Sequence, residues 1–134
     1  MAAMYSPDLL DHFEHPRNAG DLANPDISVQ RENPACGDVL KLTLVIREGH
    51  IVEIGFRAKG CVPTMACASL LTELAKGKTM EEARRLSREE LVSAIGGLPA
   101  ASTHATHLAI DTLGAALKEY ERVSRIRKNV KQNR

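Results

Sequence analysis

Tryptophan is absent from this sequence, and aromatic residues of all kinds make up only 3% of its 134 residues. Few side chains are therefore available on which the bases of a single-stranded nucleic acid could stack. Neither sign of charge dominates, because 18 Lys and Arg face 17 Asp and Glu and leave a formal net charge of +1. This balance gives no general attraction to nucleic acids or anionic membranes, so we expect neither as a partner.

Cysteine and long apolar runs are also scarce. The cysteines are Cys36, Cys61 and Cys67, an odd number without the spacing of a disulfide framework, which favours a reducing compartment. Residues 1–7 lack the basic region and apolar run of a signal peptide, and no apolar stretch approaches the length of a membrane span. The expected location is therefore the cytoplasm.

The length suits one compact domain, and the pattern of apolar residues outlines its first half. Ser6 and Pro7 are typical of the start of a helix. A short strand at residues 27–30 is followed by two clearer strands at residues 39–46 and 51–56. A tight turn joins these two strands, which predicts an antiparallel hairpin.

Helices dominate the second half of the chain. A helix is predicted from Pro63 to Gly77, and two short helices follow Thr79 and Ser87, each with acidic residues in its capped first turn. The order of elements predicts an α+β fold, in which helices pack over one face of a small antiparallel sheet of about three strands.

A long helix is expected last, with Ser102 or Thr103 as its cap and Val123 near its end. Residues 125–134 are rich in Lys and Arg and have few apolar side chains to support packing, so we expect a basic, frayed tail. The predicted organisation is a single domain of residues 1–124 followed by this tail.

Four side chains of metal-binding type stand at the ends of predicted elements. Cys36 and Asp38 flank Gly37 in a turn, Cys61 follows a strand, and His104 lies in the first turn of the long helix. Thiolates suit zinc and iron–sulfur clusters, and carboxylate and neutral imidazole can complete such a site. Taken singly, each also fits a structural role as a turn carboxylate, a buried thiol or a solvent-facing histidine.

These residues also carry a family resemblance. The motif Cys36-Gly37-Asp38, the pair Gly60-Cys61 and His104 occur in the order in which the IscU/NifU-type iron–sulfur cluster assembly scaffolds present their ligands, and the chain resembles that family. The likeness extends to residues 15–20 and 69–74 and covers nearly the whole domain. It implies the fold of the N-terminal NifU domain and a scaffold rather than an enzyme.

The resemblance implies that Cys36, Asp38, Cys61 and His104 hold iron or a small iron–sulfur cluster, for example a [2Fe–2S] cluster. Zinc suits the same four donors. The implied partners are a pyridoxal-phosphate-dependent cysteine desulfurase, which supplies sulfur, and apo iron–sulfur acceptor proteins, which receive the cluster. A carboxylate should hold a cluster less tightly than a further thiolate, which is compatible with release.

At one ligand position the sequence departs from the family. Ala105 stands where the family carries a third thiol, which is both a ligand and an acceptor of sulfur. A methyl side chain supplies neither function. Residues 98–102 keep only the first two residues of the segment that a dedicated chaperone binds in some members, so the resemblance does not imply a chaperone contact here.

Two other side chains are candidates for the missing ligand. Cys67 shares a helix face with leucines such as Leu71, which favours a place in the core. His107 lies three residues after His104 and four before Asp111. His107 could therefore extend the metal site or form an exposed pair with Asp111, and both interpretations stay open.

The alanine at position 105 leaves two other functions open. One is a zinc-bearing sulfur-transfer protein, in which a cysteine thiolate accepts sulfur as a persulfide. Zinc-dependent relatives within the superfamily are similar, but they carry an insertion that this sequence lacks. The other is a diverged member that no longer builds clusters and acts as an interaction module of the assembly complex.

Overall fold

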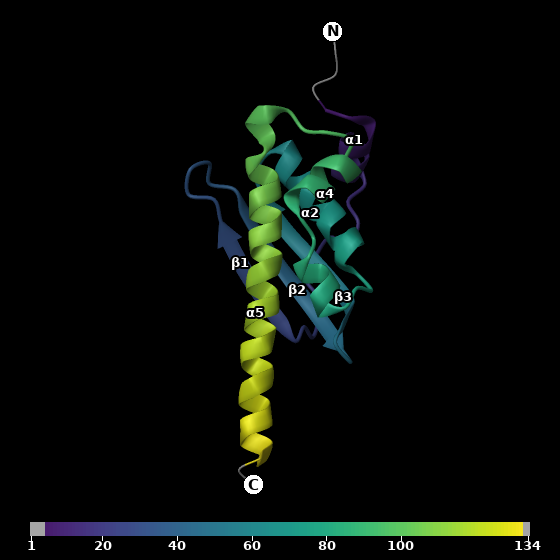
Figure 1. The fold of residues 1–134 in the computed structure, drawn as a ribbon. Helices are drawn as coiled ribbons and strands as arrows, with labels where there is room; N and C mark the ends of the chain where they lie inside the picture. Colours follow the sequence, from purple (N-terminus) through teal and green to yellow (C-terminus); the bar gives the residue numbers. More distant parts are fainter. Residues whose placement is uncertain (1–4, 133–134) are drawn as a thin grey trace.

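The computed structural model describes residues 5–132, with side chains to residue 128. A three-stranded antiparallel sheet forms the centre, in the order β1 (Ile27–Glu32), β2 (Val39–Arg47) and β3 (His50–Lys59). Two long helices, α2 (Val62–Ala75) and α5 (His104–Gln132), lie over one face of the sheet (Figure 1). This arrangement confirms the predicted α+β fold with a small antiparallel sheet.

Three shorter helices are α1 (Pro7–Glu14), α3 (Met80–Arg84) and α4 (Arg88–Ala94). The Ser6 hydroxyl accepts a hydrogen bond from the first turn of α1, and Thr79 and Ser87 each form a reciprocal capping box with the glutamate three residues later. These caps satisfy backbone N–H groups that a first helical turn leaves without partners. None of the helices described within residues 5–132 is both long and apolar enough to cross a membrane.

The last helix is longer than the sequence suggested. A short 3₁₀ turn, η1 (Ala100–Ser102), leads through Thr103 into α5, which continues to Gln132. The predicted helix end near Val123 is therefore wrong. No Gly or Pro follows Gly114, and five of the nine residues 124–132 are Arg, Lys or Gln, which are good helix formers, so the segment keeps its helix beyond the packed region.

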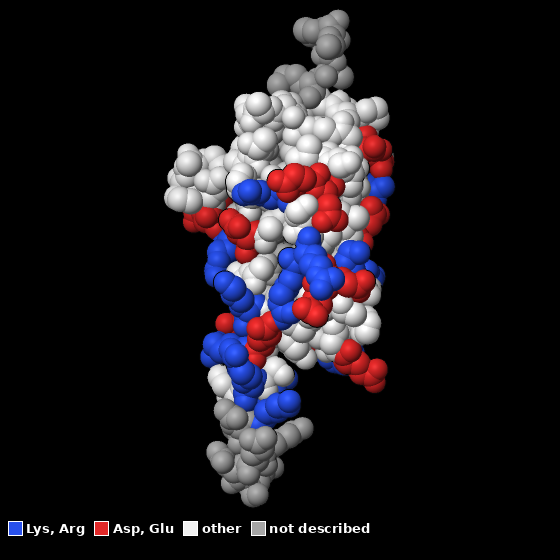
Figure 2. Space-filling view, in the orientation of Figure 1, with Lys and Arg blue, Asp and Glu red and all other residues white. Residues whose placement is uncertain are grey.

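The C-terminal part of α5 projects beyond the sheet, and Lys and Arg side chains gather along it (Figures 1 and 2). Residues 125–128 of this segment are exposed. Just before them, Arg122 pairs with Glu119, and Glu121 pairs with Arg84 of α3. The division of the chain into a domain of residues 1–124 and a basic tail stays a prediction.

Leucine side chains fill much of the space between the sheet and the helices. Leu42 and Leu44 of β2, Leu71 of α2 and Leu113 of α5 are each at most 2% exposed. Burial of one such side chain contributes about 2 kcal/mol to folding. This packing holds the starts of α2 and α5 against the strand ends that carry the predicted metal ligands.

Replacing Leu71 with alanine should lower the free energy of unfolding by about 2–5 kcal/mol, because a fully buried leucine leaves a cavity when it is truncated. Denaturant unfolding followed by circular dichroism measures the change. Leu10→Ala is the matched control, since Leu10 is 37% exposed. This substitution should lower the free energy of unfolding by well under half as much. Equal losses in the two variants would contradict this account of the core.

Candidate metal centre

A tight turn between β1 and β2 presents Cys36 and Asp38. Within it the Asn33 side chain accepts a hydrogen bond from the N–H of Ala35 at 3.0 Å, and the Asn33 carbonyl accepts one from Gly37 at 2.7 Å. Gly37 has a φ of +76°, a left-handed conformation that favours glycine. The turn therefore directs the two candidate ligands to the start of β2.

The pairing of β2 with β3 brings Cys61 to the same place. Val39 lies opposite Lys59 in the antiparallel register, so the residues just outside this pair, Asp38 and Gly60, are neighbours. A Cβ atom on Gly60 would lie 2.5 Å from the Asp38 carboxylate, which leaves room only for glycine. Cys61 follows as the N-cap residue of α2.

His104 completes the group from the first turn of α5. Its Nε2 atom lies 3.4 Å from the Asp38 carboxylate and 3.5 Å from the Cys61 sulfur, and that sulfur lies 3.5 Å from the same carboxylate oxygen. Ligand atoms of Cys36, Asp38 and His104 all lie within 4.8 Å of one another. Three separate segments thus bring the four side chains predicted as ligands into one cluster.

The hydrogen bond on the far side of the His104 ring selects a tautomer suited to metal binding. Its Nδ1 atom lies 3.2 Å from the carbonyl oxygen of Ala101. Because a carbonyl only accepts, Nδ1 carries the proton. In the neutral form of His104 the lone pair is then on Nε2, which faces Asp38 and Cys61, as in metal-binding histidines.

Asp38 is the most buried of the four, with 6% exposure, whereas Cys36 and Cys61 are exposed. Burial alone would raise the pKa of the Asp38 carboxyl. Hydrogen bonds from Thr64, Cys61 and Cys36, together with the charge of His104, outweigh burial and hold this pKa below its ordinary value. The carboxylate is therefore ionised and ready to accept a cation at neutral pH.

Thr64 supports the site and is not among the residues predicted from the sequence. It is 2% exposed, its hydroxyl donates to the Asp38 carboxylate, and its oxygen lies 3.2 Å from the Cys61 sulfur. A threonine three residues after an N-cap cysteine lies on the same side of the first helical turn. That spacing is the signal by which Thr64 could have been found.

The two candidate substitutes for the missing thiol lie elsewhere. Cys67 is fully buried, and burial raises the pKa of its thiol to about 12, which favours the interpretation as a core residue. His107 points to Arg88, with 2.6 Å between its Nδ1 and the guanidinium, and is not in the cluster of ligand atoms. Among the described residues Asp111 is exposed and forms no hydrogen bond or ion pair with His107. Ala105 is 1% exposed.

Comparison with known proteins agrees with the order and geometry of these residues. Residues 4–127 match the family described as the NifU-like N terminal domain. The chain belongs to this family. The match includes both strand-end turns and the start of α5, so every residue of the cluster lies within the NifU-like domain.

Two curated relatives of this NifU-like chain are similar over most of its length. The iron-sulfur cluster assembly scaffold protein IscU 1 of Archaeoglobus fulgidus is 40% identical over 119 residues, which cover 89% of this chain and 78% of that protein. The iron-sulfur cluster assembly scaffold protein IscU of Aquifex aeolicus is 38% identical over 122 residues, with coverage of 90% and 78%.

A solved structure shows the same fold at lower identity. The N-terminal part of a nitrogen-fixing NifU-like protein from Brucella abortus superposes with a TM-score of 0.73 at 20% identity, and the match covers 89% of this chain and 95% of that one. The helices over one face of a three-stranded sheet are therefore the arrangement of the NifU-like fold.

Gly60→Ala should disturb the metal centre with little effect on the rest of the fold. The added Cβ would overlap the Asp38 carboxylate and push it away from Thr64, so affinity for Co²⁺, measured by absorption titration, should fall about tenfold or more. Gly114→Ala is the matched control, because a Cβ there meets nothing within 4 Å. Equal Co²⁺ affinity in the two variants would contradict the proposed packing.

Thr64→Val should raise the pKa of Asp38, because it removes a hydroxyl donor and keeps the side-chain shape. A folded-state pKa below the ordinary value of 3.8 means that ionisation of Asp38 stabilises the fold. That contribution is complete above pH 3.8 and is lost as the pH falls through the folded-state pKa. In Thr64→Val the contribution should be smaller, and its loss should be complete at a higher pH.

An NMR titration of the Asp38 carboxyl carbon in the metal-free protein measures this shift. Thr64→Ser keeps the hydroxyl and should keep the lowered pKa. The assignment fails if valine and serine at position 64 give the same Asp38 pKa as threonine.

Proposed function

We propose that this chain is a scaffold for iron–sulfur cluster assembly, which binds iron or a small cluster and passes it to other proteins. The observation that carries the proposal is the convergence of Cys36, Asp38, Cys61 and His104 from three segments of the chain. The scaffold names of the Archaeoglobus and Aquifex relatives support it, since this chain covers 78% of each.

The donor set suits a cargo that must be released. Two thiolates favour iron in clusters, and the carboxylate and imidazole are harder donors that complete the coordination. Four donors also match the number that a [2Fe–2S] cluster needs. The thiols of Cys36 and Cys61 are exposed, so cargo held there would remain accessible to a partner.

The alanine at position 105 leaves Cys36 and Cys61 as the thiols of the site. A nearly buried methyl group supplies no ligand and accepts no sulfur, so in this chain those tasks would fall to Cys36 and Cys61. We propose a cysteine desulfurase as the sulfur donor and apo iron–sulfur proteins as acceptors. The protein would bind and transfer rather than turn over a substrate, and a cytoplasmic location remains part of the proposal.

Zinc in the same site is the second candidate. The two thiols, one carboxylate and one neutral imidazole could form a closed tetrahedral zinc site, with the Nε2 atom of His104 already directed into the cluster. In that case the chain would be a zinc-bearing sulfur-transfer protein, in which the thiolate of Cys36 or Cys61 attacks the outer sulfur of a donor persulfide, takes that sulfur as its own persulfide and releases the donor cysteine as a thiolate.

Anaerobic purification and reconstitution, followed by absorption spectroscopy and metal analysis, should separate these functions. The scaffold proposal predicts visible sulfur-to-iron charge-transfer bands and bound iron. Stoichiometric zinc without colour would favour the sulfur-transfer candidate. Protein that binds neither iron nor zinc would favour a diverged interaction module and would overturn the proposal.

Cys61→Ala should abolish retention of iron, because it removes one of two thiolates from the cluster of donors. Cys67→Ala is the control: it should keep full metal content and lower the free energy of unfolding by about 1 kcal/mol, since Cys67 contributes only packing. Metal content in Cys61→Ala equal to that of the unchanged protein would contradict the assignment.

A further inference from the structure

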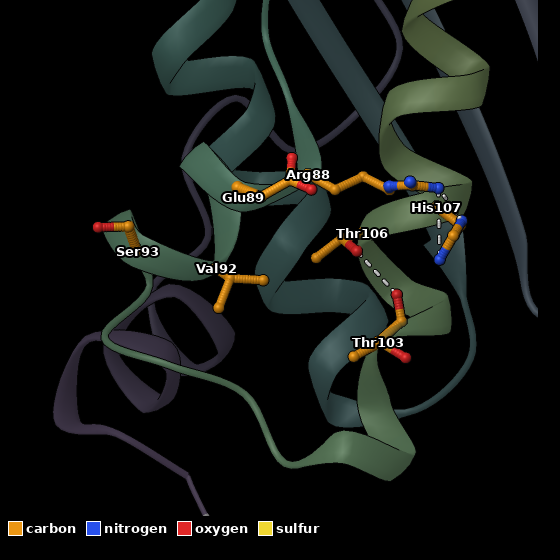
Figure 3. Close-up of a pocket in the computed structure, with 7 residues that line it drawn as sticks. All are labelled: Arg88, Glu89, Val92, Ser93, Thr103, Thr106 and His107. Carbon is orange, nitrogen blue, oxygen red and sulfur yellow. Dashed lines mark hydrogen bonds between the residues drawn. The ribbon is translucent and has the colours of Figure 1, made fainter.

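A groove of about 500 Å³ lies beside the metal centre, between α4 and the first turns of α5 (Figure 3). Its lining is formed by Arg88, Glu89, Val92, Ser93, Thr103, Thr106 and His107. The groove is far larger than a single phosphate or acetate ion and falls in the size range of sites that hold organic groups.

The groove carries one charge of each sign, because Glu89 lines it beside Arg88 without an ion pair between them, and the guanidinium makes the end toward α5 cationic. The Arg88 side chain extends from α4 to His107 on α5, and its guanidinium lies 2.6 Å from Nδ1 of the imidazole (Figure 3). Because a guanidinium only donates, Nδ1 accepts and His107 is neutral in this arrangement. No carboxylate among the described residues forms an ion pair with Arg88, so most of its N–H groups are open to an anionic ligand.

The floor of the groove is less polar. Val92 contributes an apolar side chain, and the Thr106 hydroxyl is already satisfied by donation to the Thr103 carbonyl at 2.7 Å. Thr106 is 2% exposed, so it lies at the bottom of the groove and not at its edge. A matching occupant would combine a carboxylate with a neighbouring apolar side chain, as a peptide segment does and a free ion does not.

The position of the groove connects it to the metal centre. Thr103 and His107 line the groove, and His104, whose Nε2 faces Asp38 and Cys61, lies between them in the same helical turn. The groove and the candidate metal centre therefore share one turn of α5, and none of the four candidate ligands lines the groove.

We infer that this groove docks an acidic segment of a partner protein, which places a carboxylate on Arg88 and an apolar side chain on Val92. Its use by a donor or acceptor of the cargo rests on the scaffold function proposed above. The recognition itself requires no metal, so the groove and the metal centre can be tested separately.

An NMR titration of the metal-free, ¹⁵N-labelled full chain with an acetylated, amidated Leu-Glu-Leu peptide tests the inference. Saturable shifts are expected at the amides of residues 88–93 and 103–107. The Leu-Gln-Leu peptide should bind about two- to fivefold more weakly, since it lacks the charge that pairs with Arg88. Added salt should weaken the binding of Leu-Glu-Leu more than the binding of Leu-Gln-Leu.

Arg88→Gln should reduce affinity for Leu-Glu-Leu by a similar factor and leave metal content unchanged. Arg85→Gln is the matched control, because Arg85 is also exposed and does not line the groove. Folding of both variants is checked from their amide spectra.

Several outcomes would overturn the inference: no saturable shifts, equal binding of the two peptides, or equal peptide affinity in Arg88→Gln and Arg85→Gln. Acetate or inorganic phosphate binding as tightly as the peptide would also overturn it, because the groove would then be a site for a small anion. Normal iron retention alongside any of these results would leave the scaffold proposal intact and reject only the docking site.

Discussion

The nearly buried carboxylate of Asp38 holds the candidate centre together, because it contacts the other segments that contribute a ligand. It lies 3.4 Å from His104 and 3.5 Å from Cys61, and it accepts the Thr64 hydrogen bond. Its position follows from the β2–β3 register and from the absence of a side chain at Gly60. Any change that moves Asp38 therefore affects the whole set of donors, even when the exposed thiols remain in place.

Local signals in the sequence were sufficient for most of the fold. Ser6, Thr79 and Ser87 mark helix starts through side-chain caps, and alternating apolar residues mark the hairpin. The end of α5 does not follow from packing alone, because Arg, Lys and Gln predominate beyond Val123 and no Gly or Pro ends the helix there.

The membership of the site could be predicted only in part. The resemblance supplied the order of the four ligands, but their approach depends on strand register and on the entry into α5, which no local pattern encodes. Thr64 is not predicted at all, and Gly60 is predicted only as part of a motif, because each acts through Asp38 and is chemically unremarkable alone. His107 could not be placed from spacing, since the long Arg88 side chain of another helix decides its partner.

X-ray absorption at the zinc edge of protein loaded with one equivalent of zinc tests most directly whether the four side chains form one centre. The account predicts two sulfur ligands at about 2.3 Å and two nitrogen or oxygen ligands at about 2.0 Å, with one sulfur lost in Cys36→Ala or Cys61→Ala. Coordination by nitrogen and oxygen alone, or a sulfur count that neither substitution changes, would contradict it.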